Sequence, residues 1–168
     1  MSTMATALGL HTTRTQGLPV AKYAPYYAIF PCIWAHAIVS SRALKIGYGM
    51  DNNTSPREDV SHYGEKAVQD GKITRRELNL LKRNEAAHAN SVENYPVFLA
   101  AVIFATVGGV GNARVNRACA VYTLVRGVYV AAYLVTERRR YSWVRSLAWW
   151  AGNFTCFYLF WQSGKTLA

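Results

Sequence analysis

Four long apolar stretches, separated by charged connections, dominate the pattern of this chain. They run over residues 23–44, 94–107, 118–136 and 146–162, and the helical pattern of the second begins near Arg76. A helix needs about 20 mostly apolar residues to cross the hydrocarbon layer of a membrane, and these stretches meet or approach that length. Pro31 predicts a bend in the first helix. The pattern therefore predicts an all-α fold, a transmembrane bundle of four helices.

The connections determine how these helices follow one another. Only GGVGN, residues 108–112, separates the second helix from the third, which predicts an antiparallel hairpin, and residues 137–141 make a second short connection. The first connection, about residues 46–75, contains DNNTSPRED, whose Asn, Ser and Pro content predicts an exposed loop. We expect one domain over residues 19–168 and a flexible tail over residues 1–18. A water-soluble helical bundle is the alternative, but it would have to hide four nearly uncharged runs in one small core.

Basic residues predict the orientation of the bundle, because short loops rich in Lys and Arg stay on the cytoplasmic side. The first and third connections with their flanks carry eleven Lys and Arg residues, against five on the opposite side. Both termini are therefore predicted to face the lumen or the exterior. Asn52 and Asn53 both lie in N-x-[ST] sequons on the predicted cytoplasmic side, so neither is expected to be glycosylated.

Composition narrows the classes of function. The 168 residues are 51% hydrophobic and 13% aromatic, with a formal net charge of +10. This charge is spread over the edges of the loops without a recognisable reader module, so a nucleic-acid partner is not expected. The three cysteines lie in apolar stretches without CxxC spacing, which disfavours a disulfide framework or a zinc site. Glu85 and His88 form a lone ExxH, so no metal site is predicted. The paired Trp149 and Trp150 fit an aromatic belt that faces lipid.

One charged residue, Arg126, falls in the middle of the third apolar stretch. A guanidinium at this depth costs about 2.5 to 3.5 kcal/mol on membrane-insertion scales, so a compensating group is expected. With the hairpin centred near Val110, Glu93 or Asn94 lies level with Arg126. Either a ligand site or a purely structural ion pair would explain this match.

Further polar residues lie on the same helical faces as this pair. Asn90, Glu93 and Asn94 share one face, and Arg126, Tyr129 and Tyr133 share another. The second hairpin brings Arg145 and Ser146 close to the level of Tyr133. Because arginine forms bidentate bonds to carboxylates, two arginines among amide and hydroxyl groups predict a site for an anionic, peptide-like ligand.

Two segments of the chain resemble a known family. RNEAAHANSVENYPVF, residues 83–98, is similar to the signature of the MAPEG family of membrane-associated proteins in eicosanoid and glutathione metabolism. In that signature an Asn and a Glu three residues apart precede a Pro-x-Phe ending. RGVYVAAY, residues 126–133, followed by Arg145 and Ser146, is similar to the third and fourth helices of the family. The resemblance covers roughly residues 23–161.

The resemblance implies a homotrimer in the membrane of the endoplasmic reticulum, with glutathione held between subunits on the cytoplasmic side and a lipophilic co-substrate entering from the bilayer. The predicted glutathione-binding residues are Arg83, His88, Asn90, Glu93, Asn94, Arg126, Tyr129 and Tyr133. The predicted catalytic residues are Arg145, in the place of the arginine that activates the thiol, and Ser146 beside it. A nearby cation makes a thiol with a pKa of about 8.5 a better nucleophile by stabilising its thiolate. Without such a ligand, Arg145 is an anchor for lipid headgroups.

One departure from the family keeps alternatives open. Many members that use glutathione carry an arginine where this chain has Ala86, and Arg83 lies almost one helical turn earlier. The leading hypothesis is a glutathione transferase or peroxidase acting on lipophilic electrophiles or lipid hydroperoxides. The alternatives are a glutathione-independent isomerase or cyclase of a lipophilic metabolite and a non-catalytic membrane partner.

Overall fold

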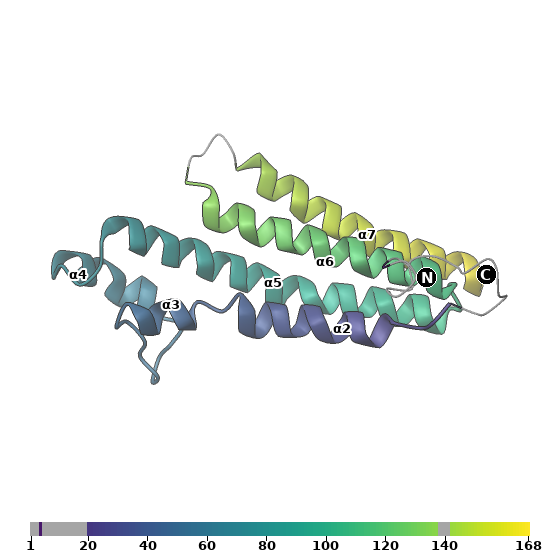
Figure 1. Ribbon diagram of the computed structural model, residues 1–168, viewed down its shortest axis with the longest axis horizontal. Coiled ribbons are helices and arrows are strands. Elements are labelled where there is room, and N and C mark those ends of the chain that lie inside the picture. The colour runs from purple at the N-terminus through teal and green to yellow at the C-terminus, as the bar shows by residue number, and fades with distance from the viewer. Residues whose placement is uncertain (1–3, 5–19, 138–141) are drawn as a thin grey trace.

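The computed structural model describes Met4, residues 20–137 and residues 142–168. Within these residues every regular element is a helix. The bundle consists of four helical lines, each made of one helix or of two consecutive helical elements (Figure 1). They are α2 (Ala24–Ile33) continued by η1 (Trp34–Ile38), α5 (Arg75–Val107), α6 (Asn112–Val135) and α7 (Trp143–Leu167). Three short elements lie at one end: α3 (Arg42–Gly47), η2 (Asp59–Tyr63) and α4 (Gly64–Gln69). The predicted all-α bundle is confirmed, whereas the predicted tail lies outside the described residues except for Met4.

The first helical line is shorter than its sequence predicted. One helix was expected over residues 23–44, but η1 ends at Ile38 and α3 begins only at Arg42. Pro31 lies inside α2, where it removes an N–H donor and crowds the preceding turn. The wider π-helical turn η1 follows, as such turns often do where a regular helix is disturbed. Beyond its end, the side-chain amide of Asn84 donates to the Val39 carbonyl oxygen at 3.0 Å, which holds the break against α5.

The long helix α5 begins one residue before the predicted position. Thr74 and Glu77 form a capping box, in which the Thr74 hydroxyl accepts from the Glu77 N–H and the Glu77 carboxylate accepts from the Thr74 N–H. Hydrogen bonds donated by the Thr74 N–H and hydroxyl to the Glu77 carboxylate lower the pKa of Glu77. Nearby, hydrogen bonds from Lys82 and Arg75 lower the pKa of Glu65. Both carboxylates are therefore held in the charged form, and the start of α5 is sharply defined.

The exposed loop predicted from DNNTSPRED is confirmed over residues 51–58, which lie outside any helix and are mostly exposed, whereas the rest of the first connection is a folded cap that was not predicted. Its apolar side chains pack on the first turns of α5 around Leu78 and Leu81, both fully buried. Beneath them Lys45 Nζ lies 2.6 Å from Glu85 Oε1 and 3.6 Å from Asp59 Oδ2. The periodicity missed this cap because its helices are short and its buried ion pairs join residues far apart in sequence. The cap fastens α3 and the segment after it to α5.

The predicted hairpin between the second and third helices is confirmed. Gly109 adopts a φ of +75° in the turn, a left-handed conformation that favours glycine. At Gly108 an added Cβ would lie 2.5 Å from Ser163 Oγ, so α7 passes closely over the turn. The connection between α6 and α7 carries Arg138, Arg139 and Arg140, which lie outside the described residues.

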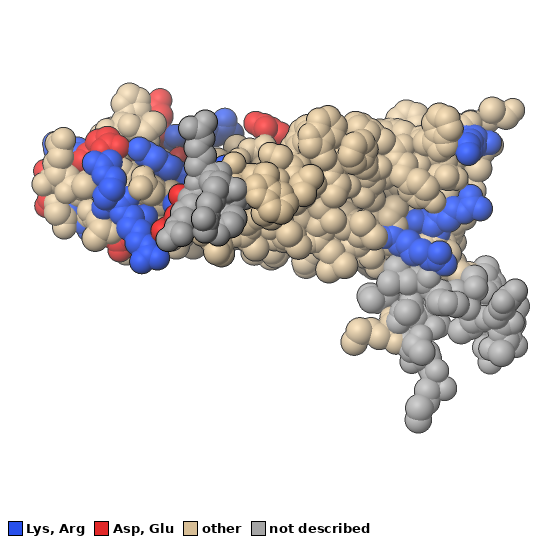
Figure 2. Space-filling model, turned by 90° about the horizontal axis from the view of Figure 1, so that it is seen from above, with Lys and Arg blue, Asp and Glu red and all other residues tan. Residues whose placement is uncertain are grey.

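Charge is distributed unevenly along the bundle. In the view of Figure 2, Lys, Arg, Asp and Glu gather over the end with α3 and α4, a few basic residues mark the opposite tip, and the middle is mostly uncharged. Among the described helices, α6 is the one that is both long enough and apolar enough to cross a membrane by composition alone, with a mean hydropathy of 1.6. The sequence-based prediction of three further spans stays a prediction.

Candidate functional site

A ladder of cations and aromatic rings runs along one face of α6 and reaches α7. The Arg126 guanidinium lies 4.5 Å from the centre of the Tyr129 ring, and the Tyr129 and Tyr133 rings are 5.1 Å apart. At the far end, the Arg145 guanidinium lies 4.5 Å from the centre of the Tyr133 ring. The spacing of three and then four residues places the α6 members on one face, as the sequence predicted. Each guanidinium is thereby held in a fixed orientation by a cation–π contact.

A pocket of about 360 Å³ opens beside this ladder. It is lined by Asn90 of α5, Tyr129 and Tyr133 of α6, and Ser142, Arg145, Ser146, Trp149 and Trp150 at and within the start of α7. Five predicted site residues, from three helices, therefore meet at one place. The volume lies at the low end of the range of about 300–1,000 Å³ that is typical of small-molecule sites.

Arg126 is the most deeply buried charge in this region, with 3% of its surface exposed. Its Nη2 donates to the backbone oxygen of Asn90 at 3.0 Å, while its buried Nη1 has no hydrogen-bond partner. A buried donor left unpaired is costly, and Arg126 does not itself line the pocket but contacts two residues that do, Asn90 and Tyr129.

The predicted pairing of Arg126 with Glu93 within one chain is wrong. Glu93 is exposed on α5, and no ion pair joins it to Arg126 within the part of the chain that the structure describes. The Tyr122 hydroxyl donates to Asn94, and Arg126 donates to Asn90. Both pairs are centred on position 108 of the sequence, which is therefore the centre of the hairpin. The prediction centred the hairpin two residues later, at Val110, because the sequence does not reveal where α5 stops and the turn begins.

The Asn94 side chain serves a network that joins three helices. Its Nδ2 donates to Asn153 Oδ1 of α7 at 2.9 Å, and its Oδ1 accepts from the Tyr122 hydroxyl of α6 at 2.8 Å. Asn153 in turn donates to the Trp149 backbone oxygen. All three side chains are buried. Asn94 was predicted to bind glutathione, and in this chain its amide holds the helices behind the pocket together.

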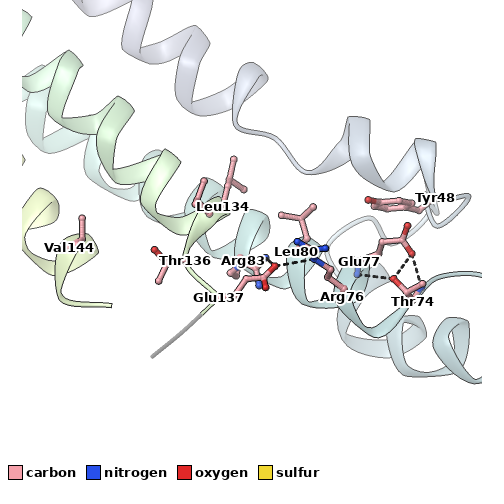
Figure 3. Close-up of a pocket in the computed structure, with 11 residues that line it drawn as sticks. Tyr48, Thr74, Arg76, Glu77, Leu80, Arg83, Leu134, Thr136, Glu137 and Val144 are labelled. Atoms are coloured by element: carbon pink, nitrogen blue, oxygen red, sulfur yellow. Dashed lines mark hydrogen bonds and ion pairs between the residues drawn. The ribbon is translucent and has the colours of Figure 1, made fainter. Parts of the chain in front are cut away.

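Two other predicted ligand residues lie outside the pocket. His88 Nδ1 is 2.9 Å from the backbone oxygen of Ala35, at the contact between α5 and η1. Arg83 lies in a second, larger pocket, where its Nη2 is 3.6 Å from Glu137 Oε1 (Figure 3). Arg83 therefore does not supply the cation that is missing at the position of Ala86.

Sequence reasoning missed part of the pocket wall. Trp149 and Trp150 were interpreted as lipid-facing, yet both line the pocket, with ring centroids 4.9 Å apart in an edge-on arrangement. Ser142, one residue before α7, was not considered. The sequence did contain a signal for this role. Both tryptophans follow Arg145 by little more than one helical turn, and the start of that helix lies close to Tyr133.

Comparison with known proteins gives one match. The family model described as the MAPEG family matches residues 23–165, which include the whole ladder and every residue of the pocket. Searches among curated proteins and among solved structures found no match to this chain.

Proposed function

Because this chain belongs to the MAPEG family, whose members are membrane proteins of glutathione and eicosanoid metabolism, we propose that it is a glutathione transferase or peroxidase. Its substrates are lipophilic electrophiles or lipid hydroperoxides. The observation that carries this proposal is the ladder from Arg126 to Arg145, with an unpaired buried donor at one end and a guanidinium in the lining of the pocket at the other. Such a site suits an anionic tripeptide with a reactive thiol.

In the proposed mechanism the two arginines have different tasks. Arg126, with Asn90 beside it, binds a carboxylate of glutathione deep in the bundle, where Nη1 is free to donate. Arg145 lies at the mouth and stabilises the thiolate, while Ser146 lies within reach as a second donor. The thiol proton passes to water, and the thiolate attacks the electrophilic atom of the lipophilic substrate while the bond to the leaving group breaks with its electron pair. With a lipid hydroperoxide the O–O bond breaks, the alcohol leaves, and a second glutathione reduces the resulting sulfenic acid to give glutathione disulfide and water. Tyr129 and Tyr133 hold both guanidinium groups in place.

The same proposal includes assembly and location. A carboxylate exposed among apolar residues, as Glu93 is, needs a polar partner in a membrane, and a second copy of the chain supplies one in the homotrimer that the family resemblance implies. We further propose that all four helical lines cross the membrane of the endoplasmic reticulum, with the termini lumenal and the pocket toward the cytoplasm. The excess of basic residues on the first and third connections supports this orientation.

Replacing Arg145 tests the catalytic role. Arg145→Ala is expected to lower the rate of glutathione conjugation at pH 7 by roughly tenfold, because losing one unit of thiol pKa depression reduces the thiolate fraction by that factor. The ultraviolet absorbance of the bound thiolate should shift to higher pH in parallel, and Arg145→Lys should restore part of both. Arg114→Ala, at the other end of the bundle, is the matched control. An unchanged rate and an unchanged thiolate titration in Arg145→Ala would contradict the proposal.

A second function has one structural feature in its favour. Ala86 provides no cation, and Arg83 is turned toward Glu137 rather than toward the pocket, so the site holds one cation fewer than many family members that use glutathione. A glutathione-independent isomerase or cyclase on the same scaffold would explain this difference. Turnover of a lipophilic substrate by the purified protein, with and without glutathione, separates the two functions.

A further inference from the structure

A second pocket, larger than the proposed glutathione site, shares no lining residue with it. It has a volume of about 1000 Å³ and lies between the first turns of α5, the end of α6 and the start of α7 (Figure 3). The proposed catalytic chemistry gives this pocket no role.

Two arginines of this pocket converge on a single carboxylate oxygen. Arg76 Nε lies 3.2 Å and Arg83 Nη2 lies 3.6 Å from the same Oε1 atom of Glu137. The Arg83 side chain is only 18% exposed, and its buried Nε has no hydrogen-bond partner. Arg76 and Arg83 are seven residues apart, two helical turns, and therefore lie on one face of α5. This face offers more donors than Glu137 uses.

The rest of the pocket wall is largely apolar. Leu80 lies between the two arginines on α5, and Leu134 and Val144 face it from α6 and α7. The other acidic residue of the lining, Glu77, has its carboxylate bound to the N–H and hydroxyl groups of Thr74. Glu137 is thus the carboxylate that competes directly for the arginines. A cationic mouth beside an apolar wall fits a ligand with an anionic head and an apolar chain.

We propose that this pocket binds a single-chain amphiphile with an anionic head, which displaces the Glu137 carboxylate from Arg83 and Arg76. The chain of the ligand lies along Leu80, Leu134 and Val144. The pocket is at the charged end of the bundle, beside its uncharged middle (Figure 2), where the head of an amphiphile stays in water and its chain enters the apolar layer. The carboxylate of a fatty acid and the phosphate of an alkyl phosphate share this chemistry.

The binding test uses the purified full chain in nanodiscs of a zwitterionic phospholipid. The probes are a fluorescent polyene fatty acid, its methyl ester, octadecyl phosphate and inorganic phosphate. The acid is expected to bind and the methyl ester to bind at least about tenfold more weakly, as the loss of a charge-assisted hydrogen bond predicts. Octadecyl phosphate should displace the acid, whereas inorganic phosphate and glutathione should not.

Two variants are expected to change the affinity in opposite directions. Arg83→Gln should weaken binding of the acid about tenfold, because the less exposed arginine provides the buried donor. Glu137→Gln should tighten binding, because it removes the competing charge. Arg57→Gln, an exposed arginine outside the pocket, is the control. Circular dichroism and thermal unfolding show whether each variant is folded.

Several results would overturn the proposal. Equal binding of the acid and its methyl ester would show simple partition into apolar surface. Displacement by inorganic phosphate as effective as that by octadecyl phosphate would show that the apolar chain makes no contribution. Weaker binding in Glu137→Gln would mean that Glu137 supports the ligand rather than competes with it. Displacement by glutathione would show that the two pockets are one site.

Discussion

At the scale of single residues, Arg126 shows how a buried charge can be tolerated. Its guanidinium has a backbone oxygen on one side and the face of Tyr129 on the other, but no carboxylate of the described chain within ion-pair distance. Buried charges without a full set of partners contribute little to stability and are often better replaced by apolar groups. An arginine held in this way is more easily explained by ligand binding than by stability.

Replacing Arg126 with methionine separates these two roles. Arg126→Met keeps much of the volume and removes the charge, so the temperature of unfolding is expected to stay the same or rise. The affinity for glutathione should fall at least about tenfold, the effect of losing a charge-assisted hydrogen bond. Thermal unfolding and calorimetric titration of the detergent-purified protein measure the two quantities. A large loss of stability with unchanged glutathione affinity would identify Arg126 as a structural residue.

At the scale of elements, the polar network of Asn94, Tyr122 and Asn153 fixes the register of three helices. Apolar contacts alone permit helices to slide, because one aliphatic side chain replaces another at similar cost. Hydrogen bonds between buried side chains do not permit this sliding, since each change of register leaves donors and acceptors unpaired. Stacking of Phe98 on Tyr122, with centroids 3.9 Å apart, adds to this alignment. The network reaches the wall of the smaller pocket, because Asn153 donates to the backbone oxygen of Trp149, which lines it.

Removing the central amide should therefore weaken the bundle. Asn94→Ala leaves the Tyr122 hydroxyl and Asn153 Oδ1 without a partner, which is expected to lower the free energy of unfolding by about 1–3 kcal/mol. Denaturant titration in detergent, followed by tryptophan fluorescence, gives this value. Asn79→Ala, on the exposed side of the same helix, is the control and should have little effect. Equal stability of the two variants would show that the network is dispensable.

At the scale of the whole molecule, the two ends of the bundle differ in charge. The tip with the α5–α6 turn carries Lys22, Arg114, Arg117 and Lys165 and no Asp or Glu among the described residues. The other end holds a mixture of both signs, much of it in ion pairs such as those of Glu65 with Arg75 and Lys82. Orientation follows the number of Lys and Arg residues near short loops rather than the net charge, so the end with α3 and α4 is predicted to be cytoplasmic.

Labelling from either side of the membrane tests this orientation. In microsomes, Ser55→Cys is expected to react with an impermeant maleimide added outside, and Gly111→Cys only after the membrane is opened. Gly111 has open space around it and a negative φ, so the substitution is compatible with the fold. In the unsubstituted chain, where both sequons are intact, Asn52 and Asn53 should remain unglycosylated. Glycosylation of either residue, or the reverse pattern of labelling, would mean that the bundle is inserted the other way.

Four features could be predicted from the sequence alone: the helical class, the hairpin at GGVGN, the start of α5 and the shared face of Arg126, Tyr129 and Tyr133. These features depend on local signals, namely apolar runs, capping residues, glycines and the helical repeat. The sequence also predicted that Arg145 and Ser146 lie close to the level of Tyr133, and in the structure they line one pocket with Tyr133 and Asn90, because short hairpins limit which helical levels can meet.

Which side chains contact one another follows only from the three-dimensional structure. The partner of Arg126, the separate pocket of Arg83, the use of Asn94 as a link between helices and the buried Lys45 beneath the first connection all depend on exact register and on contacts between distant segments. A shift of two residues in the centre of the turn changes the residue opposite each side chain by four positions, which is about 6 Å along the helix at 1.5 Å per residue. Hydrogen bonds tolerate only a few tenths of an ångström, so apolar patterning, which is insensitive to such shifts, cannot specify them.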